Sequence, residues 1–141
     1  MMFSCPIQIR MSDLDPYNHA NNGSQCNYFD MGRSRFFEHA FQEKIDWLTF
    51  KYVLVHVDLD FKMPVQFHDD LYCESAVLEV GNSSFKMLQR LVDRNTGAVK
   101  TLCHAVVVYY DRATNTPERI PDHDRQKLAS AIADDIALEH N

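Results

Sequence analysis

The chain has 141 residues, of which 45% are hydrophobic and 11% aromatic, and its formal net charge is −6. This length and apolar content predict one domain, residues 1–141, with a core of its own. The acidic balance and the lack of a basic run argue against a nucleic-acid partner. No apolar run approaches the roughly 20 residues of a membrane span, and Met1 to Arg10 lack the pattern of a signal peptide. We therefore expect a cytoplasmic protein without a membrane partner.

The N-terminal part is predicted to form a strand and then a long helix. Phe3 to Met11 reads as a strand, and a polar segment separates it from a helix over about Ser24 to Phe41. Phe29, Phe36 and Ala40 recur at helical spacing, and further aromatic residues widen this apolar face. A helix with so broad an apolar face should be covered over most of its circumference.

Four strands are predicted next. From Val53 to Phe61, apolar residues at the odd positions alternate with mostly polar ones, which indicates a long strand with one buried face. Short turns separate the later strands, so we expect consecutive strands to pair as an antiparallel meander. The later strands are predicted over Leu71–Val80, Phe85–Val92 and Val99–Tyr110.

A second helix is predicted over about Asp122 to Glu139, because Leu128, Ile132 and Ile136 fall four residues apart on one stripe. Asp122 is a candidate to cap its N-terminus. The whole pattern predicts an α+β fold, in which an antiparallel sheet of about five strands wraps one long central helix and a C-terminal helix lies on the surface.

The four cysteines form no CxxC pair, and no Cys/His spacing resembles a zinc site. Cys73 and Cys103 lie in apolar-periodic stretches, where they read as small buried hydrophobic residues. We expect no metal and no cofactor.

The segment from Arg10 to Arg35 is unusually polar for a link between a strand and a buried helix. Turn formation and helix capping account for such residue types. However, Asp15 precedes Pro16 and lies seven residues before Asn22, which leads into the predicted helix, and unpaired N–H groups at a helix start stabilise an oxyanion. A carboxylate and such N–H groups facing one carbonyl are what acyl transfer to water needs. The polar residues concentrated here are Asp13, Asp15, Asn18, His19, Asn21 and Asn22.

The same segment resembles hotdog-fold acyl-CoA thioesterases of the 4-hydroxybenzoyl-CoA thioesterase type. Their pattern is Asp-x-Asp, then His-x-Asn-Asn, then an aromatic-rich helix with an acidic residue shortly before an Arg. Here these positions hold Asp13-Leu14-Asp15, His19-Ala20-Asn21-Asn22, Asp30 and Arg33. The likeness continues, in order, through residues 61–70, 79–85, 110–114 and 120–121.

The resemblance implies hydrolysis of a thioester with Asp15 as nucleophile or general base. Asn22 matches the residue whose backbone N–H polarises the carbonyl. His19 would either orient Asp15 or brace the loop. Asp30 is the rival carboxylate, because another hotdog branch carries its acid on the helix, and Arg33 is placed to pair with it.

The resemblance also implies an acyl thioester of CoA or acyl carrier protein as substrate, and a homodimer or homotetramer with active sites at the subunit interface. Lys62, Lys86 and Arg90 are candidates to bind the CoA phosphates, together with the hydroxyls of Ser83 and Ser84. Solvated strand faces and turn chemistry explain the same residues.

Three alternatives stay open. A non-catalytic acyl-CoA-binding module of the same fold needs no carboxylate aimed at a carbonyl, so Asp15 favours the enzyme. A hydratase or dehydratase would use a His and an acid, which His19 and Asp30 could imitate. A metal site formed by Asp13, Asp15 and His19 lacks an evident fourth ligand.

Departures from the family pattern leave the acyl preference open. Gln25 stands where many relatives have Tyr, Asp30 where they have Glu, and Gly32 where they have Ala. The depth of the acyl pocket is expected to depend on Gln25, Tyr28, Met31 and Met63.

Overall fold

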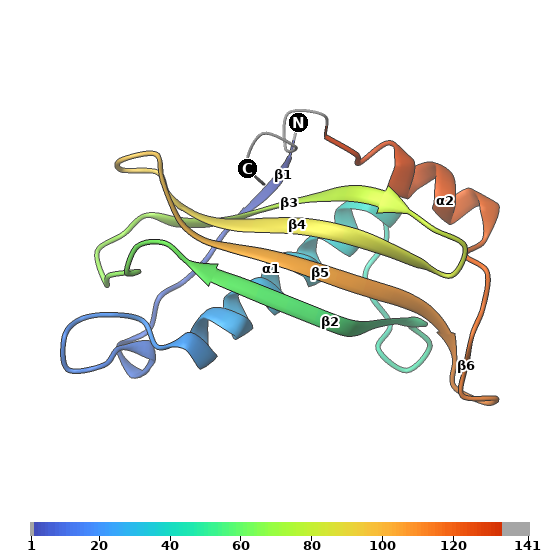
Figure 1. Ribbon diagram of the computed structural model, residues 1–141, viewed down its shortest axis with the longest axis horizontal. Coiled ribbons are helices and arrows are strands. Elements are labelled where there is room, and N and C mark those ends of the chain that lie inside the picture. Colours follow the sequence, from blue (N-terminus) through green and yellow to red (C-terminus); the bar gives the residue numbers. More distant parts are fainter. Residues whose placement is uncertain (1, 134–141) are drawn as a thin grey trace.

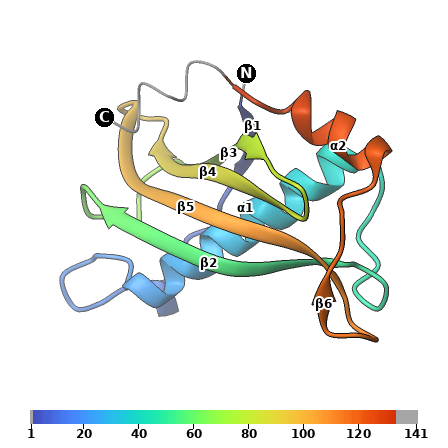
Figure 2. The same cartoon turned by 45° about the vertical axis from the view of Figure 1, so that its right-hand side comes forward.

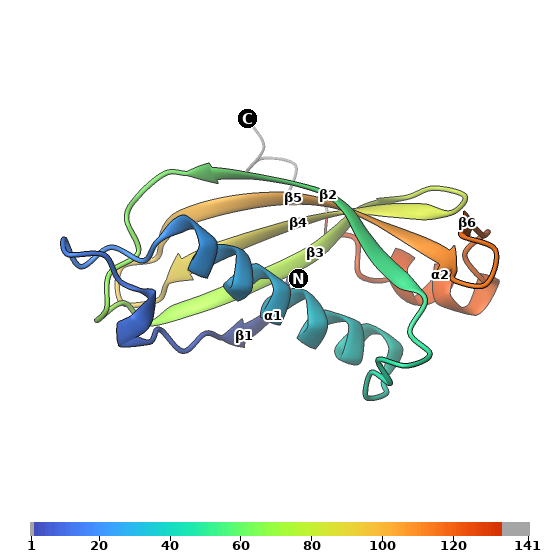
Figure 3. The ribbon, with the colours of Figure 1, turned by 90° about the horizontal axis from the view of Figure 1, so that it is seen from below.

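One long helix lies across one face of an antiparallel sheet in the computed structural model, which describes residues 2–133 (Figure 1). This arrangement confirms the predicted α+β hotdog fold. Figure 3 shows α1 running along the sheet, with the loop that precedes it at its N-terminal tip. The elements are β1 (Phe3–Pro6), a 3-10 turn η1 (Met11–Asp13), α1 (Asn22–Phe41), β2 (Tyr52–Phe61), β3 (Leu71–Val80), β4 (Ser84–Asp93), β5 (Ala98–Asp111), β6 (Thr116–Pro117) and α2 (Asp122–Ala129).

The strand order of the sheet is β1-β3-β4-β5-β2, with β6 attached to β5. The meander prediction is therefore wrong for β2, which pairs with β5 and not with β3. The connection 62–70 has to pass the ends of β5 and β4 to reach β3. In Figures 1 and 2, β2 forms the free edge of the sheet.

The core lies between α1 and the sheet. Phe36 and Phe37 of α1 pack with Phe85 and Met87 of β4 in one cluster of buried residues. Cys73 and Cys103 are fully buried, as predicted. Gly32 permits a close approach of α1 to β3, because a Cβ at this position would overlap the side chain of Cys73.

The sequence predicted one face of the strand Val53–Phe61 to be buried, but this face is exposed in the single chain. Val53, Val55, Val57 and Phe61 are 37%, 57%, 39% and 46% exposed. A bulge between Leu54 and His56 interrupts the alternation, and the edge position leaves one side of β2 without a neighbouring strand. The result is a strand with exposed apolar side chains on an open sheet edge.

The N-terminal elements differ from the prediction at their ends. β1 stops at Pro6, and the N–H of Ile7 continues the contact with β3 by donating to the carbonyl of Leu71 at 2.8 Å. Helix α1 begins at Asn22 because Asn21 caps it, with its side chain accepting the N–H of Ser24 at 2.7 Å. One face of α1 is buried, rather than most of its circumference.

The second helix is shorter than predicted. It ends at Ala129, and Asp122 is its first residue rather than its cap, which is Pro121. Ile132 lies beyond the end of the helix and forms a parallel β-bridge with Val77 of β3. The part of the predicted helix over residues 134–139 lies outside the described residues. Within residues 2–133, no helix is long and apolar enough to cross a membrane.

Candidate active site

The loop between η1 and α1 holds Asp15 in a closed turn. Leu14 and Ala20 form an antiparallel bridge, and the N–H of Asp15 donates to the carbonyl of His19 at 2.9 Å. Asn18 closes the turn with a left-handed backbone, φ 62°. Asn tolerates this conformation better than most residues.

The carboxylate of Asp15 is fixed through one of its two oxygens. Oδ1 accepts the backbone N–H groups of Tyr17 at 2.8 Å and His19 at 3.0 Å. Within the part of the chain that the structure describes, Oδ2 has no hydrogen-bond donor, so it is available to a reacting group. The His19 contribution to this geometry is its main-chain N–H, not its ring.

The N-terminal tip of α1 presents unpaired N–H groups. Asn21 accepts Ser24 N–H through its side chain and Gln25 N–H through its carbonyl, at 2.7 and 3.1 Å. The N–H groups of Asn22 and Gly23 find no acceptor among residues 2–133. These groups carry the positive end of the helix dipole.

A pocket of about 440 Å³ joins these two features. Its walls come from the Asp15 loop, the first turn of α1 and the segment after β2. The structure thus brings together four predicted site residues: Asp15, His19, Asn22 and Lys62. The pocket is lined by Asp15, His19, Ala20, Asn21, Asn22, Gln25, Phe61, Lys62, Met63 and Pro64.

Gln25 lies between the pocket and the core. It is 3% exposed, its Oε1 accepts the hydroxyl of Thr101 at 2.6 Å, and its Nε2 donates to the carbonyl of Ala20 at 3.4 Å. A buried amide therefore forms part of the pocket wall at this position. Of the other residues expected to set the pocket depth, Met63 lines this pocket, whereas Tyr28 and Met31 line a different groove on the far side of α1.

Asp13 anchors the loop from behind, a role that the sequence did not reveal. Its carboxylate is 2% exposed and accepts the Tyr28 hydroxyl at 2.6 Å and Arg10 N–H at 2.9 Å. Burial acts to raise the pKa of Asp13, but the hydrogen bonds from Tyr28 and Arg10 outweigh it and hold this pKa below its usual value. Burial and the Asp13 charge raise the pKa of Tyr28, which stays protonated as a donor.

The remaining predicted binding residues lie elsewhere in the same chain. Phe61, beside the pocket, pairs with Thr101, whereas Ser84 pairs with Val108, seven residues further along β5 and about 24 Å away at strand spacing. Ser83 lies next to Ser84, in the turn at that end of the sheet. Figure 1 shows the β3–β4 turn and the loop before α1 at opposite ends of the molecule.

Lys86 and Arg90 lie on β4 with acidic partners. Lys86 pairs with Glu79 at 2.9 Å on an exposed surface, and Arg90 pairs with Glu74 at 2.6 Å where both are partly buried. Neither residue lines the Asp15 pocket.

Asp30 does not line the Asp15 pocket either. It pairs with Arg33 at 2.8 Å, which confirms the predicted i,i+3 pair, and both residues line a separate groove of about 290 Å³ between α1 and β2. Arg33 is buried, and its Nε has no partner among the described residues.

Burial raises the pKa of Cys103 to about 12, more than the nearby Arg33 lowers it, so this thiol is not a nucleophile at neutral pH.

The structure gives no support to a metal site at Asp13, Asp15 and His19. Among residues 2–133 there is no group of three or more His, Cys, Asp or Glu side chains arranged to hold an ion. Asp13 faces Tyr28 and Arg10 instead.

A long helix packed on an antiparallel sheet, with a carboxylate pocket at the helix tip, defines the class as a hotdog-fold protein. The sequence of residues 9–130 matches the family model of the thioesterase-like superfamily, so the chain belongs to this superfamily. No curated protein matches the sequence.

Three solved structures show how widely the fold is shared. A predicted thioesterase from Bacillus stearothermophilus is 25% identical, with a TM-score of 0.86 and coverage of 94% of this chain and 98% of that one. A thioesterase from Thermus thermophilus, complexed with coenzyme A and Zn, is 23% identical, with a TM-score of 0.78 and coverage of 89% and 95%. The hypothetical protein SAV2348 from Staphylococcus aureus, in complex with CoA, is 10% identical, with a TM-score of 0.80 and coverage of 93% and 84%.

Proposed function

We propose that this protein hydrolyses an acyl thioester of CoA or acyl carrier protein to a free acid and a thiol. Membership of the thioesterase-like superfamily supports thioester hydrolysis in general. The observation that carries the proposal is that Asp15 and the tip of α1 line one pocket. The more specific resemblance to 4-hydroxybenzoyl-CoA thioesterases stays a prediction.

Asp15 is the proposed catalytic carboxylate. As a nucleophile, its Oδ2 attacks the carbonyl carbon, the thiolate leaves, and water then hydrolyses the acyl–aspartyl anhydride. As a general base, Oδ2 takes a proton from the water that attacks the same carbon, and the C–S bond then breaks to release the thiolate. Both routes use the oxygen that no described donor occupies. His19 acts through its main-chain N–H, which orients the other oxygen.

The N–H of Asn22 is the proposed oxyanion donor. It lies at the positive end of α1, where the negative charge that develops on the carbonyl oxygen is stabilised. Loss of one such donor typically costs about 3 kcal/mol of barrier. Because the group belongs to the backbone, the Asn22 side chain is secondary, and the cap at Asn21 fixes the donor.

CoA is the first carrier to test. The proteins from Thermus thermophilus and Staphylococcus aureus are described in complex with CoA. Lys62 lies on the rim of the pocket and is exposed, which suits a contact with a phosphate. Ser83, Ser84 and Lys86 lie too far along the sheet to join it within one chain, and Arg90 lies near the pocket end of the sheet but pairs with Glu74.

A second copy of the chain is the proposed partner. The open edge of β2 exposes Val53, Val55, Val57 and Phe61, and such an edge tends to pair with another strand. A two-fold pairing of β2 with β2 would place the β3–β4 turn of one copy on the side where the Asp15 pocket of the other copy lies. Ser83 and Ser84 would then serve the partner's pocket.

The direct test is thiol release from a panel of acyl-CoA substrates, read with a thiol reagent. Release above the spontaneous rate from at least one substrate is expected. Release from none, with CoA still bound, would favour a binding module of the same fold. In a single turnover in ¹⁸O water, ¹⁸O recovered in the Asp15 peptide would establish the anhydride route with attack of water on the aspartyl carbonyl, whereas the general-base route places ¹⁸O only in the product acid.

A further inference from the structure

A β-bulge at the start of β5 lies behind the Asp15 pocket. Leu91 of β4 pairs with Thr101, whereas Val92 pairs with Val99, so Lys100 is an extra residue without a partner on β4. Bulges bend a strand and change the direction of its side chains, and they recur beside active sites. Here the consecutive residues Lys100 and Thr101 are both buried, with 6% and 0% of their surface exposed.

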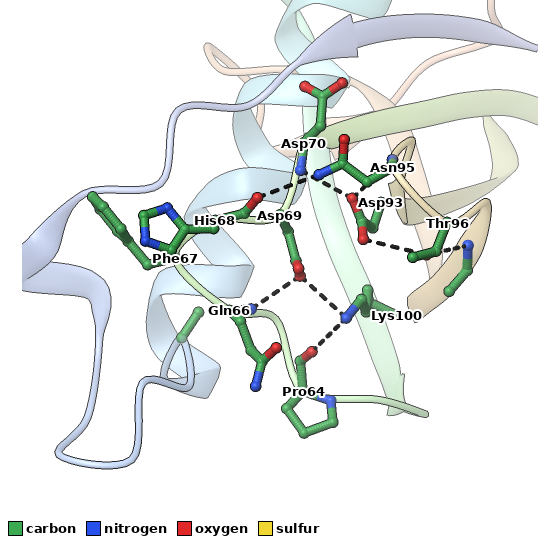
Figure 4. Close-up of polar contacts among 12 residues, drawn as sticks. Pro64, Gln66, Phe67, His68, Asp69, Asp70, Asp93, Asn95, Thr96 and Lys100 are labelled. Atoms are coloured by element: carbon green, nitrogen blue, oxygen red, sulfur yellow. Dashed lines mark hydrogen bonds and ion pairs between the residues drawn. The ribbon is translucent and has the colours of Figure 1, made fainter.

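Lys100 makes four contacts to the connection 62–70. Its carbonyl accepts the N–H groups of Lys62 at 2.9 Å and Met63 at 3.0 Å. Its ammonium group donates to the carbonyl of Pro64 at 3.0 Å and pairs with Asp69 at 3.2 Å. Figure 4 shows the ammonium group between these two oxygens.

The Lys100–Asp69 pair is withdrawn from solvent, with 8% and 9% of the side chains exposed. Asp69 also accepts the N–H of Gln66 at 3.0 Å, which closes the turn of the connection (Figure 4). Burying two charges costs free energy that hydrophobic residues would not cost, so such a pair is weak evidence for stability alone. A geometric role is the better explanation of this pair.

The connection in turn holds the Asp15 loop. Val65 accepts the N–H of Ala20 at 2.8 Å, and the Asn18 side chain accepts the N–H of Phe67 at 3.1 Å. Asn18 and Ala20 lie on either side of His19, whose N–H fixes Asp15. The contacts therefore run without a gap from Lys100 to the proposed catalytic loop.

The neighbouring bulge residue reaches the opposite wall. The hydroxyl of Thr101 donates to Gln25 in the first turns of α1 at 2.6 Å. Two consecutive residues of β5 thus contact two walls of one pocket, the segment Met63–Pro64 and the helix tip.

We propose that Lys100 is a positioning residue: through Pro64 and Asp69 it sets the wall of the pocket against the Asp15 loop. The proposal rests on the function proposed above, because the geometry it sets is that of the thioester and Asp15. It assigns Lys100 no contact with substrate. A displacement of about 1 Å in such a site costs up to about 100-fold in rate.

The test compares Lys100→Met, which leaves Asp69 buried without a cation, with the double variant Lys100→Met/Asp69→Asn, which removes both charges. Lys51→Met is the matched control, because it breaks an ion pair of 2.8 Å with Glu118 where β2 begins, at the end of the strand away from the Asp15 pocket. Each protein is assayed well below its Tm for kcat and KM on an acyl-CoA substrate. Hydrogen exchange at the amides of Met63 and Ala20 is measured in parallel.

The proposal predicts that Lys100→Met and the double variant both lose about 10- to 100-fold in kcat with little change in KM, although the double variant has the higher Tm of the two. Lys51→Met should keep the wild-type kcat. A kcat within threefold of wild type in either Lys100 variant would overturn the proposal.

The exchange measurement separates this proposal from the proposed function. If the wild type releases no thiol, hydrolysis fails, and exchange alone decides the role of Lys100. Exchange at Met63 and Ala20 that is about tenfold faster in Lys100→Met, but not in Lys51→Met, supports the positioning role. Unchanged exchange at both amides contradicts it.

Discussion

The hydroxyl of Tyr28 donates a hydrogen bond of 2.6 Å to the carboxylate of Asp13, and this bond ties the buried helix to the loop that carries Asp15. Asp13 also fixes the helix cap, because its carbonyl accepts both the backbone and the side-chain N–H groups of Asn21, at 2.8 and 3.1 Å. The two proposed catalytic elements therefore share one buried anchor.

The first prediction concerns the pH dependence of stability. The pKa of Asp13 is lower in the folded protein than in the unfolded chain, so the ionised carboxylate stabilises the fold above a pH of about 4. This contribution is lost as the pH falls through the lowered pKa. Asp13→Asn should cost about 1 to 3 kcal/mol at pH 7, and less at pH 2.5, when unfolding is followed by circular dichroism. An equal cost at both pH values would contradict the assignment.

The second prediction concerns Gly32. A Cβ at this position would overlap the Cys73 side chain, which is fully buried, so Gly32→Ala should cost about 1 to 3 kcal/mol of unfolding free energy. The cost should fall by about 1 kcal/mol when Cys73→Ala is present, because the smaller side chain makes room. Urea titrations of the four proteins measure this coupling. Strictly additive costs would show that Cys73 is not the obstacle.

The third prediction concerns the edge of β2. The wild type should have a mass of at least twice 16.4 kDa in solution at micromolar concentration. Val57→Lys places a charge on the exposed edge strand and should yield a monomer. Thr114→Lys, in the turn before β6, is the control that keeps the wild-type mass. Light scattering after gel filtration measures all three, and a monomeric wild type would contradict the prediction.

The sequence predicted the elements of the fold better than their pairing. Alternation identified the strands, because side chains in a strand point to opposite faces. Alternation carries no information on which strand lies beside which, and β2 pairs with β5, not with β3. Its valines are exposed in the structure, because alternation predicts an apolar face but does not predict what covers that face.

Three of the four predicted residues that line the pocket are close together in the sequence, and Lys62 is the exception. Asp15, His19 and Asn22 lie within one loop and helix start, so spacing alone places them together. The sequence does not predict the roles of Lys100 and Asp69, because they meet the pocket through long-range contacts and a bulge that no pattern reveals turns Lys100 toward the connection 62–70. The hydrogen bond between Thr101 and Gln25, which are 76 positions apart, is also a long-range contact that the sequence does not predict.

Asp15→Asn is the variant that tests the central claim most directly. It keeps an oxygen to accept the N–H groups of Tyr17 and His19, but it removes the charge needed for attack or for proton transfer. In a thiol-release assay with the best acyl-CoA substrate, kcat should fall by at least about 100-fold with little change in KM. A kcat close to that of the wild type would contradict the account and assign the chemistry to another residue.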